Sequence, residues 1–393
     1  MNFRSLFLKH LAQTSPEPMG LEIVKSKGLY LWDRDHKRYA DMISGIGVSS
    51  IGHQHPAVVA AVKDQVDQYM HTLVYGEFVL EPQVRYAKKL TDMLHPSLNS
   101  IYLVNSGAEA TEAGLKLAKR YTGRPKIVSC FESYHGSTTG AMALNSDAYF
   151  HRPYRPLMPG VSHIHFNDLA DLKIIDEFTA AVVVEPVQAE RGLYPPDPGY
   201  LEALRRRCSE VGALLIMDEI QTGFGRTGRL FAHQKYDVVP DIMLIAKGMG
   251  GGMPIGGMVA DKKLMDVFSH DPVLGHITTF GGHPVTCAAA LATLNVLLKE
   301  DYIDSVQSKE AYIRKVMHHD KIKELRTAGL WAAIELYSEA EMHSVVKKGL
   351  ERGYIYDWFL FNAQSVRIAP PLNITMEELE TACLHLLEIL DEI

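Results

Sequence analysis

The chain has 393 residues, of which 47% are hydrophobic and 22% are charged, and its formal net charge at pH 7 is -7. This length exceeds the size at which one hydrophobic core stops growing, so we expect two domains. The acidic balance argues against nucleic acid as a partner and favours small molecules. The four cysteines form no C-x-x-C pair, which argues against a zinc ribbon or a disulfide framework and fits a reducing cytoplasm.

The first 18 residues, MNFRSLFLKHLAQTSPEP, contain an apolar stretch that is too short and too interrupted for a signal peptide. We expect a short surface helix here, stopped by Pro16 and Pro18. Along the sequence, no run approaches the roughly 18 apolar residues of a membrane span. A cytoplasmic protein without a membrane partner is therefore expected.

Next in chain order, GLYLWDRDHKRYADM predicts a β-hairpin, and five short apolar runs then alternate with helical patterns. These runs are SIYLV, KIVSC, AAVVVEPV, ALLIMDEI and DIMLIA. They predict an α/β fold with a mainly parallel sheet covered by helices on both faces. After Pro284 a long helical stretch leads to KIKELRTAGLWAAIEL and SVRIAPPL. We therefore place a large domain at residues 52–297 and a small α+β domain at residues 1–51 plus 298–393.

Lys247 stands in AKGMGGGMPIGG, where the run DIMLI gives way to glycines. One interpretation is a solvated turn, because most lysines are exposed. The other is a nucleophilic amine at a strand end, since a desolvated lysine titrates low enough to attack a carbonyl. The glycines would also let the backbone approach a ligand closely. This lysine alone does not decide between the two.

Residues directly after the other runs are further candidates, because ligands of an open parallel sheet gather beyond the carboxyl ends of its strands. Ser106, Gly107 and Ala108 follow SIYLV and open a helix. The free N–H groups of that helix favour a phosphate, although a plain serine N-cap has the same sequence. Tyr134 and His135 follow KIVSC; the tyrosine is either a core aromatic or a ring that stacks on a planar cofactor.

Two carboxylates, Glu185 and Asp218, follow very apolar runs and need partners, since an unpaired buried charge is costly. For Asp218 the partner is either an arginine, Arg226 or Arg229, or the protonated nitrogen of a cofactor ring. With Lys247, these positions supply an amine, a phosphate cup, a stacking ring and a counter-ion. Those are the requirements of pyridoxal phosphate.

Two further motifs are weak. GFGRTG, residues 223–228, satisfies G-x-G-x-x-G but follows DEIQT and leads into no clear amphipathic helix. His53 and His55 form an HQH pair without a third ligand at a telling spacing, so we expect no metal site.

Motifs spread over nearly the whole chain resemble, in the same order, those of the class III, or ω-type, pyridoxal-phosphate aminotransferases of fold type I. They are SGIGVSSIGHQHP, NSGAEATE, YHG, EPVQAERG, MDEIQTGFGRTG, AKGMGGGMPIGG, TTFGGHP and VRIAPPL. The resemblance, which is to the acetylornithine, ornithine and 4-aminobutyrate group, implies that Lys247 forms a Schiff base with the cofactor.

The same resemblance implies roles for the other motif residues. Asp218 pairs with the pyridine nitrogen, Ile220 and Gln221 contact the ring face and the phenolic oxygen, and Tyr134 stacks on the ring. The other expected cofactor-binding residues are Ser106, Gly107 and Ala108, which hold the phosphate, together with His135 and Glu185.

A second set of roles concerns the substrate and the partner subunit. Thr279 reaches the phosphate of the other subunit's cofactor, which implies a homodimer with shared active sites. Arg367 binds a substrate carboxylate, and Glu190 pairs with it between half-reactions. The other interpretation of Arg367 is a surface arginine before a Pro-Pro turn.

The chain departs from the family pattern at two positions. Many relatives have arginine just after the aromatic-His-Gly triplet, where this chain has Ser137, so a second carboxylate clamp is in doubt. His36 stands in the hairpin where glycine is usual, which we expect to change a turn and not the chemistry.

The predicted function is an aminotransferase that moves an amino group from an ω-amino donor to a keto acid such as 2-oxoglutarate. Lys247 serves as nucleophile and as acid and base. The alternatives are an aminotransferase for simple amines, diamines or β-amino acids with pyruvate, or an aminomutase or decarboxylase on the same scaffold. A sheet protein that binds nucleotide through GFGRTG is the non-enzymatic alternative.

Overall fold

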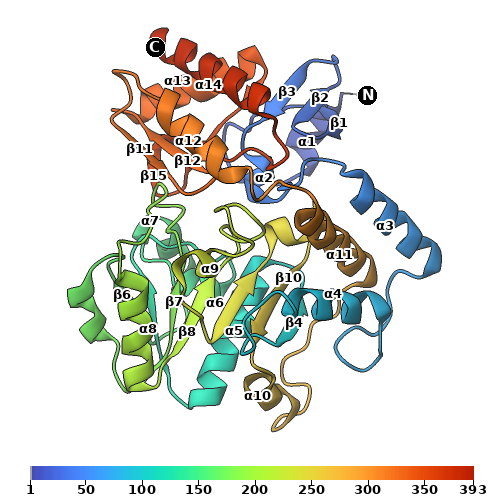
Figure 1. Ribbon diagram of the computed structural model, residues 1–393, viewed down its shortest axis with the longest axis vertical. Coiled ribbons are helices and arrows are strands. Elements are labelled where there is room, and N and C mark those ends of the chain that lie inside the picture. Colours follow the sequence, from blue (N-terminus) through green and yellow to red (C-terminus); the bar gives the residue numbers. More distant parts are fainter. Residues whose placement is uncertain (1) are drawn as a thin grey trace.

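The computed structural model describes residues 2–393, which form three sheets and the helices around them (Figure 1). The central sheet has seven strands in the order β4-β10-β9-β8-β7-β5-β6. Its strands are β4 (Ser100–Val104), β5 (Lys126–Cys130), β6 (Val161–Ile164), β7 (Thr179–Val184), β8 (Leu214–Asp218), β9 (Ile242–Ile245) and β10 (Gly256–Ala260). All neighbours pair in parallel except β10, which is antiparallel to both β4 and β9. The predicted α/β fold with a mainly parallel sheet is confirmed.

The five predicted apolar runs are β4, β5, β7, β8 and β9. Sequence reasoning did not single out β6, which has two polar residues among four, or β10, which begins with two glycines. Gly256 is needed because a Cβ there would lie 2.5 Å from the carbonyl oxygen of Ser106. Strand β10 closely approaches another backbone, and this approach leaves no room for a side chain at its first residue. Its glycine-rich sequence is explained in this way.

Helices cover both faces of the central sheet, because alternate residues of a strand point to opposite sides. Ile216 of β8 packs in a cluster with α5 residues such as Leu117, whereas Leu215 and Met217 pack with α8 residues such as Leu204. The helices of this part are α3 (Pro56–Gln68), α4 (Glu81–Thr91), α5 (Gly107–Thr122), α6 (Thr139–Ala143), α7 (Ala148–His151), α8 (Tyr200–Val211), α9 (Ala232–Tyr236), α10 (Lys262–Met265) and α11 (Pro284–Lys299). Short 3-10 helices are η1 (Arg152–Tyr154), η2 (Leu169–Ile174), η3 (Lys247–Gly250) and η4 (Asp266–Ser269).

The two chain ends form the upper part of Figure 1. One sheet has the order β1-β2-β3-β13, with β1 (Ile23–Lys27), β2 (Tyr30–Asp33), β3 (Arg38–Asp41) and β13 (Tyr354–Ile355). The other has the order β11-β12-β15-β14, with β11 (Glu324–Thr327), β12 (Ala332–Glu335), β14 (Asp357–Phe359) and β15 (Asn362–Ile368). The helices are α1 (Phe3–His10), α2 (Ser44–Gly47), α12 (Val306–Val316), α13 (Glu339–Arg352) and α14 (Met376–Asp391).

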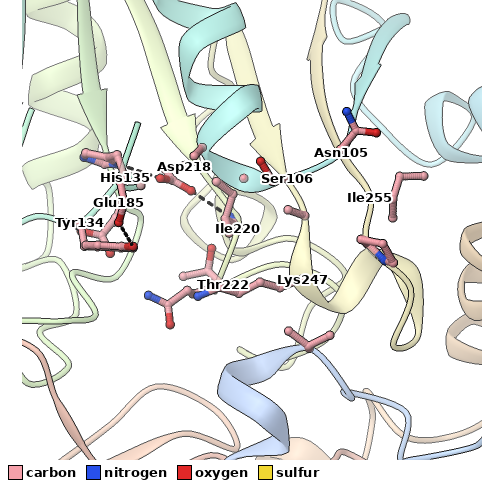
Figure 2. A pocket seen from close by; sticks show the side chains of 18 of the residues that line it. Asn105, Ser106, Tyr134, His135, Glu185, Asp218, Ile220, Thr222, Lys247 and Ile255 are labelled. Atoms are coloured by element: carbon pink, nitrogen blue, oxygen red, sulfur yellow. Dashed lines mark hydrogen bonds and ion pairs between the residues drawn. The ribbon is translucent and has the colours of Figure 1, made fainter. Parts of the chain in front are cut away.

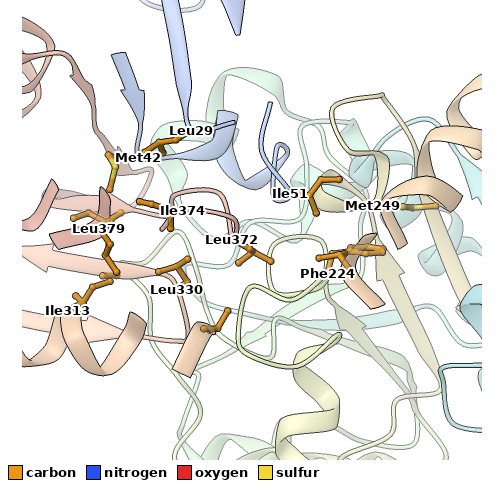
Figure 3. Packing of buried hydrophobic residues seen from close by; sticks show 14 of the residues in the cluster. Leu29, Met42, Ile51, Phe224, Met249, Ile313, Leu330, Leu372, Ile374 and Leu379 are labelled. Atoms are coloured by element: carbon orange, nitrogen blue, oxygen red, sulfur yellow. The ribbon is translucent and has the colours of Figure 1, made fainter. Parts of the chain in front are cut away.

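Strand β3 pairs in parallel with β13, so the N-terminal and C-terminal segments share a sheet. One hydrophobic cluster also joins residues of both ends, such as Met42 and Leu379, with central residues such as Phe224 and Met249 (Figure 3). The division at residues 51/52 and 297/298 stays a prediction.

The hairpin β2–β3 is confirmed, and His36 in its turn has φ of 63°, the left-handed region in which glycine is usual. The N-terminal helix is exposed, as expected, but the predicted stop at Pro16 and Pro18 is wrong. Helix α1 ends at His10, where Leu11 turns to extended backbone. Among the described residues, no helix combines the length and apolar character that crossing a bilayer requires.

Candidate active site

A cavity of about 520 Å³ lies at the carboxyl ends of the parallel strands (Figure 2). The predicted site residues that line it are Ser106, Gly107, Ala108, Tyr134, His135, Glu185, Asp218, Ile220, Gln221 and Lys247. Its remaining lining residues are Val48, Asn105, Gly136, Ser137, Thr222, Ala246, Gly252, Met253, Pro254 and Ile255. Within residues 2–393, this wall does not include Glu190, Arg367 or Thr279.

The N-terminus of α5 forms one end of the cavity. Ser106 is its N-cap, and the serine Oγ accepts from the backbone N–H of Glu109 at 3.2 Å. The N–H groups of Gly107 and Ala108 precede the first intrahelical hydrogen bond, so they are available to an anion. Gly136, with φ of 131°, packs against this turn, where a Cβ would lie 2.7 Å from that of Ala108. This uncrowded, positively polarised cup fits a phosphate group.

Asn105 extends the cup and was not predicted. Its backbone N–H and its side-chain amide both donate to Oε2 of Glu109, at 2.7 and 2.9 Å. The same amide nitrogen donates to Oγ1 of Thr278 at 3.0 Å. Its position directly before the predicted phosphate cup was the signal in the sequence.

Asp218, at the end of β8, is buried and accepts from His135. The His135 Nδ1 lies 2.6 Å from Asp218 Oδ2, and the backbone N–H of Ile220 donates to Oδ1 at 3.0 Å. The alternative in which Arg226 or Arg229 pairs with Asp218 is therefore wrong. Arg226 instead donates to backbone carbonyls of Leu330 and Pro370, each at 2.7 Å, and Arg229 is exposed. Asp218 thus has a fixed orientation at the cavity wall, which fits a counter-ion for a ring nitrogen.

Glu185 is buried beside Asp218, and its carboxylate oxygens accept from the N–H groups of Tyr134 and Ala189 at 3.4 and 3.2 Å. Burial, with the charge of Asp218 as the next cause, raises the pKa of Glu185 well above its usual value. Two adjacent carboxylates in a dry site do not both ionise readily. These effects favour the protonated form of Glu185, which offers a hydrogen-bond donor beside Asp218.

Lys247 lies two residues after the end of β9 and begins η3, with φ of 46°, an unusual backbone conformation for a residue with a side chain. Burial lowers the pKa of the Lys247 amine to about 8, although the negative charge of Glu190 opposes the shift. About a tenth of such an amine is neutral at pH 7, far more than of an ordinary lysine. Of the two interpretations of this lysine, the structure favours the nucleophile, because the amine belongs to the cavity wall.

Arg367 and Glu190 form a buried ion pair next to the cavity. The Arg367 Nη2 lies 2.5 Å from Glu190 Oε2, and the guanidinium stacks on Phe359 at 4.5 Å from the ring centroid. Burial alone would raise the pKa of Glu190, but the charges of Arg367 and Lys247 outweigh it and the pKa lies below its usual value. Arg367 is 3% exposed, so the interpretation as a surface arginine is wrong.

Gln221 links this ion pair to the cavity. It lines the cavity, and its Nε2 donates to Oε1 of Glu190 at 3.1 Å. The backbone N–H of Leu360 donates to the other oxygen of Glu190 at 2.9 Å. Glu190 therefore has hydrogen-bond partners besides Arg367.

Ser137 and Thr279 concern two expectations from the sequence, a missing second carboxylate clamp and a contact with the partner subunit. The Ser137 Oγ lies 3.0 Å from the hydroxyl of Tyr134, so a neutral pair stands at this side of the cavity. Thr279 is exposed, in the segment between η4 and α11. Its predicted contact with a partner's cofactor lies beyond a single chain and stays a prediction.

These features define the class of protein. A strand-end lysine of low pKa, a helix N-terminus and a buried carboxylate around one cavity are the requirements of a pyridoxal-phosphate enzyme. The family model described as aminotransferase class-III matches residues 11–390. The chain belongs to this family of enzymes, and its cofactor is pyridoxal 5'-phosphate.

Individual relatives agree with this assignment. An acetylornithine aminotransferase from Caldanaerobacter subterraneus is 37% identical over 384 residues, which cover 94% of this chain and 95% of that protein. The structure of the ornithine aminotransferase from Toxoplasma gondii has a TM-score of 0.91 at 32% identity, covering 99% and 94% of the two chains. An (S)-enantioselective omega-transaminase from Thermomicrobium roseum has a TM-score of 0.92 at 26% identity, covering 100% and 99%.

Proposed function

We propose that this aminotransferase takes its amino group from an ω-amino donor of the ornithine, acetylornithine or 4-aminobutyrate kind and transfers it to a keto acid such as 2-oxoglutarate. The observation that carries the proposal is the buried pair of Arg367 and Glu190 beside the cavity. Such a pair offers a carboxylate-binding arginine that can be neutralised from within the protein.

The residues of the cavity have distinct tasks toward the cofactor. Ser106, Gly107 and Ala108 would hold its phosphate, and Asp218 its ring nitrogen, with His135 fixing the aspartate. When bound, pyridoxal phosphate supplies an aldehyde and an electron-withdrawing ring that stabilises negative charge on the substrate carbon. Lys247 accepts and returns the transferred proton at Nζ, for which a pKa of about 8 is suited near neutral pH.

Arg367 has two partners in the proposed cycle. A donor whose reacting amine is far from its carboxylate leaves Arg367 paired with Glu190. A keto acid presents a carboxylate next to its reacting carbon, and this group replaces Glu190 on the planar guanidinium. The hydrogen bonds from Gln221 and Leu360 then stabilise the released Glu190.

Ser137 favours a second candidate, an aminotransferase for simple amines, diamines or β-amino acids with pyruvate. Its hydroxyl pairs with that of Tyr134 and supplies no positive charge for a distal carboxylate. The likeness to the Thermomicrobium omega-transaminase agrees with this alternative. An aminomutase or decarboxylase would need no acceptor, so amino-group exchange with added keto acid separates that class from an aminotransferase.

We also propose a homodimer with shared active sites, in which Thr279 reaches the partner's cofactor phosphate. Large apolar side chains near this threonine support the proposal, because Ile277 and Phe280 are 47% and 55% exposed. On a neighbouring loop, Phe78 and Val79 are 55% and 92% exposed. A reducing cytoplasm is the proposed compartment, supported by four cysteines that are all free and buried.

The experiment is a donor panel assayed with 2-oxoglutarate and with pyruvate, with the keto products identified by mass spectrometry. We expect ornithine, acetylornithine or 4-aminobutyrate to give the highest kcat/KM, with 2-oxoglutarate as acceptor. Preference for unsubstituted alkylamines over every ω-amino acid would overturn the donor class. Turnover without any keto acid would overturn amino transfer itself.

A further inference from the structure

Residues Ser44–Gly47, labelled α2 in Figure 1, form a left-handed helical turn. The φ angles of these four consecutive residues are 51°, 56°, 64° and 73°. The backbone N–H groups of Gly47 and Val48 donate to the carbonyls of Ile43 and Ser44, each at 2.9 Å. Residues with side chains avoid this conformation, and successive left-handed residues are unusual. Surrounding structure must therefore hold the turn, and strain of this kind concentrates at functional sites.

Asp41 stabilises the turn through hydrogen bonds from backbone N–H groups to its carboxylate. Its Oδ1 accepts from the backbone N–H of Ile43 at 3.0 Å, and its Oδ2 accepts from that of Gly45 at 3.1 Å. His53 Nε2 lies 2.8 Å from the same Oδ2. Asp41 is 2% exposed, so these charge-assisted hydrogen bonds are formed in a dry environment, where they are strong.

The turn touches the strand end that carries Arg367. The hydroxyl of Ser44 donates to the carbonyl of Ala369 at 2.7 Å, and the N–H of Ala369 donates to the carbonyl of Met42 at 2.7 Å. Ala369 lies two residues after Arg367. The first residue of the strained turn, together with Met42 just before it, therefore holds the segment that directly follows the proposed substrate-binding arginine.

The chain directly after the turn touches the Lys247 loop and the cavity. Val48 lines the cavity. Ser50 packs so closely on Gly248 that a Cβ on that glycine would lie 2.8 Å from the serine Oγ. The carbonyl of Ser50 also accepts from the N–H of Leu372 at 2.7 Å. Figure 3 shows Ile51, Leu372, Phe224 and Met249 in the same packed cluster.

We infer that the left-handed turn Ser44–Gly47 is a rigid spacer that fixes Arg367 relative to Lys247, and that Asp41 is its positioning residue. The inference rests on the proposed function of Arg367 as the site for the keto-acid carboxylate. A keto acid must engage both Arg367 and the reacting centre at once, whereas an ω-amino donor leaves Arg367 on Glu190. A loosened spacer therefore impairs the acceptor half-reaction and spares the donor half-reaction.

The test uses Asp41→Asn and Gly47→Ala in the holoenzyme. The first variant keeps the side-chain volume but replaces one acceptor oxygen by an amide. The second adds a methyl group where no atom lies within 4 Å, so it introduces strain without a clash. Gly123→Ala is the matched control, because Gly123 has φ of 67° and equally open space, at the opposite end of α5 from the phosphate cup.

Three measurements are compared: KM in each half-reaction, the Kd of glutarate by calorimetry, and backbone amide hydrogen exchange at residues 44–48. For both turn variants we expect the keto-acid KM and the glutarate Kd to rise about tenfold, the donor KM to change less than about twofold, and exchange to accelerate. Gly123→Ala should leave both KM values unchanged. A purely structural role would lower the active fraction without this split between the half-reactions.

Arg367→Ala, measured in parallel, separates the two possible failures. If this variant leaves the keto-acid KM unchanged, the proposed function of Arg367 fails. If it raises that KM while the turn variants affect both half-reactions equally, or neither, the spacer inference is overturned and the function of Arg367 stands.

Discussion

His135 and Asp218 form a buried pair in which Nδ1 of the imidazole lies 2.6 Å from Oδ2 of the carboxylate. The N–H of Ile220 holds the other oxygen at 3.0 Å. Neither side chain has freedom to turn, so the carboxylate presented at the cavity keeps one orientation.

Asp218→Asn is expected to retain the cofactor but to lose most of the reaction rate, because a neutral amide no longer keeps a ring nitrogen protonated. Loss of one charge of a pair in a dry site costs roughly 3–5 kcal/mol, or two to four orders of magnitude in rate. Single-turnover kinetics of each half-reaction measure the effect. Asp241→Asn is the control, because Asp241 pairs with Arg205 at 2.7 Å before β9, at the other end of the same sheet. Near-normal half-reactions in Asp218→Asn would contradict the assignment.

Lys247 in the cofactor-free protein is expected to react with acetic anhydride with an apparent midpoint near pH 8. The amine reacts in its neutral form, so the rate rises with pH and levels off above that value. Peptide mass spectrometry follows the modification, with the solvent-exposed Lys235 as the internal reference. In the holoenzyme, borohydride should fix the cofactor to Lys247, and Lys247→Ala should abolish turnover. Attachment to another lysine would refute the assignment.

Arg367→Ala is expected to raise the keto-acid KM by about two orders of magnitude and the donor KM by far less, because a bidentate contact is lost in one half-reaction. Arg326→Ala controls for the removal of a buried arginine, since Arg326 pairs with Glu335 at 2.7 Å. The control should lose stability without a difference between the two substrates. Equal damage to both half-reactions in Arg367→Ala would exclude the proposed exchange of partners.

Ser137→Arg is expected to lower the KM of acetylornithine about tenfold and to leave the KM of a monoamine unchanged or higher, because the new cation meets a distal carboxylate. Steady-state kinetics with both donors check this. Ser137→Gln controls for side-chain size without charge. An equal effect of the two substitutions would show that charge at this position does not select the donor.

Shared active sites predict complementation between two defective chains. Hybrids of Lys247→Ala and Thr279→Val chains place both defects in one site and leave the other intact, so they should recover about half of the activity per dimer. Sedimentation should show at least a dimer at assay concentrations. An active monomer, or hybrids no better than the Thr279→Val parent, would contradict the proposal.

Sequence reasoning located the residues that follow strands, because strand ends, glycines and charged residues are local patterns. These patterns place Lys247, Asp218 and the cup from Ser106 to Ala108 at one edge of the sheet. Sequence reasoning did not find that His135 is the partner of Asp218, since 83 residues separate the two. Nor did it find Val48, because a left-handed turn held by Asp41 depends on contacts with Ala369 that no local pattern records. Such long-range contacts depend on the tertiary fold.

The hydrogen bond between Asn105 and Thr278 has a consequence for cofactor binding. Asn105 belongs to the cavity of its own chain, and Thr278 precedes the residue proposed to reach the partner's cofactor. In the proposed dimer, cofactor affinity and subunit affinity are then thermodynamically linked, and the linkage is reciprocal. Diluting the enzyme until the protomers separate must weaken cofactor binding, and adding cofactor must lower the concentration at which protomers assemble.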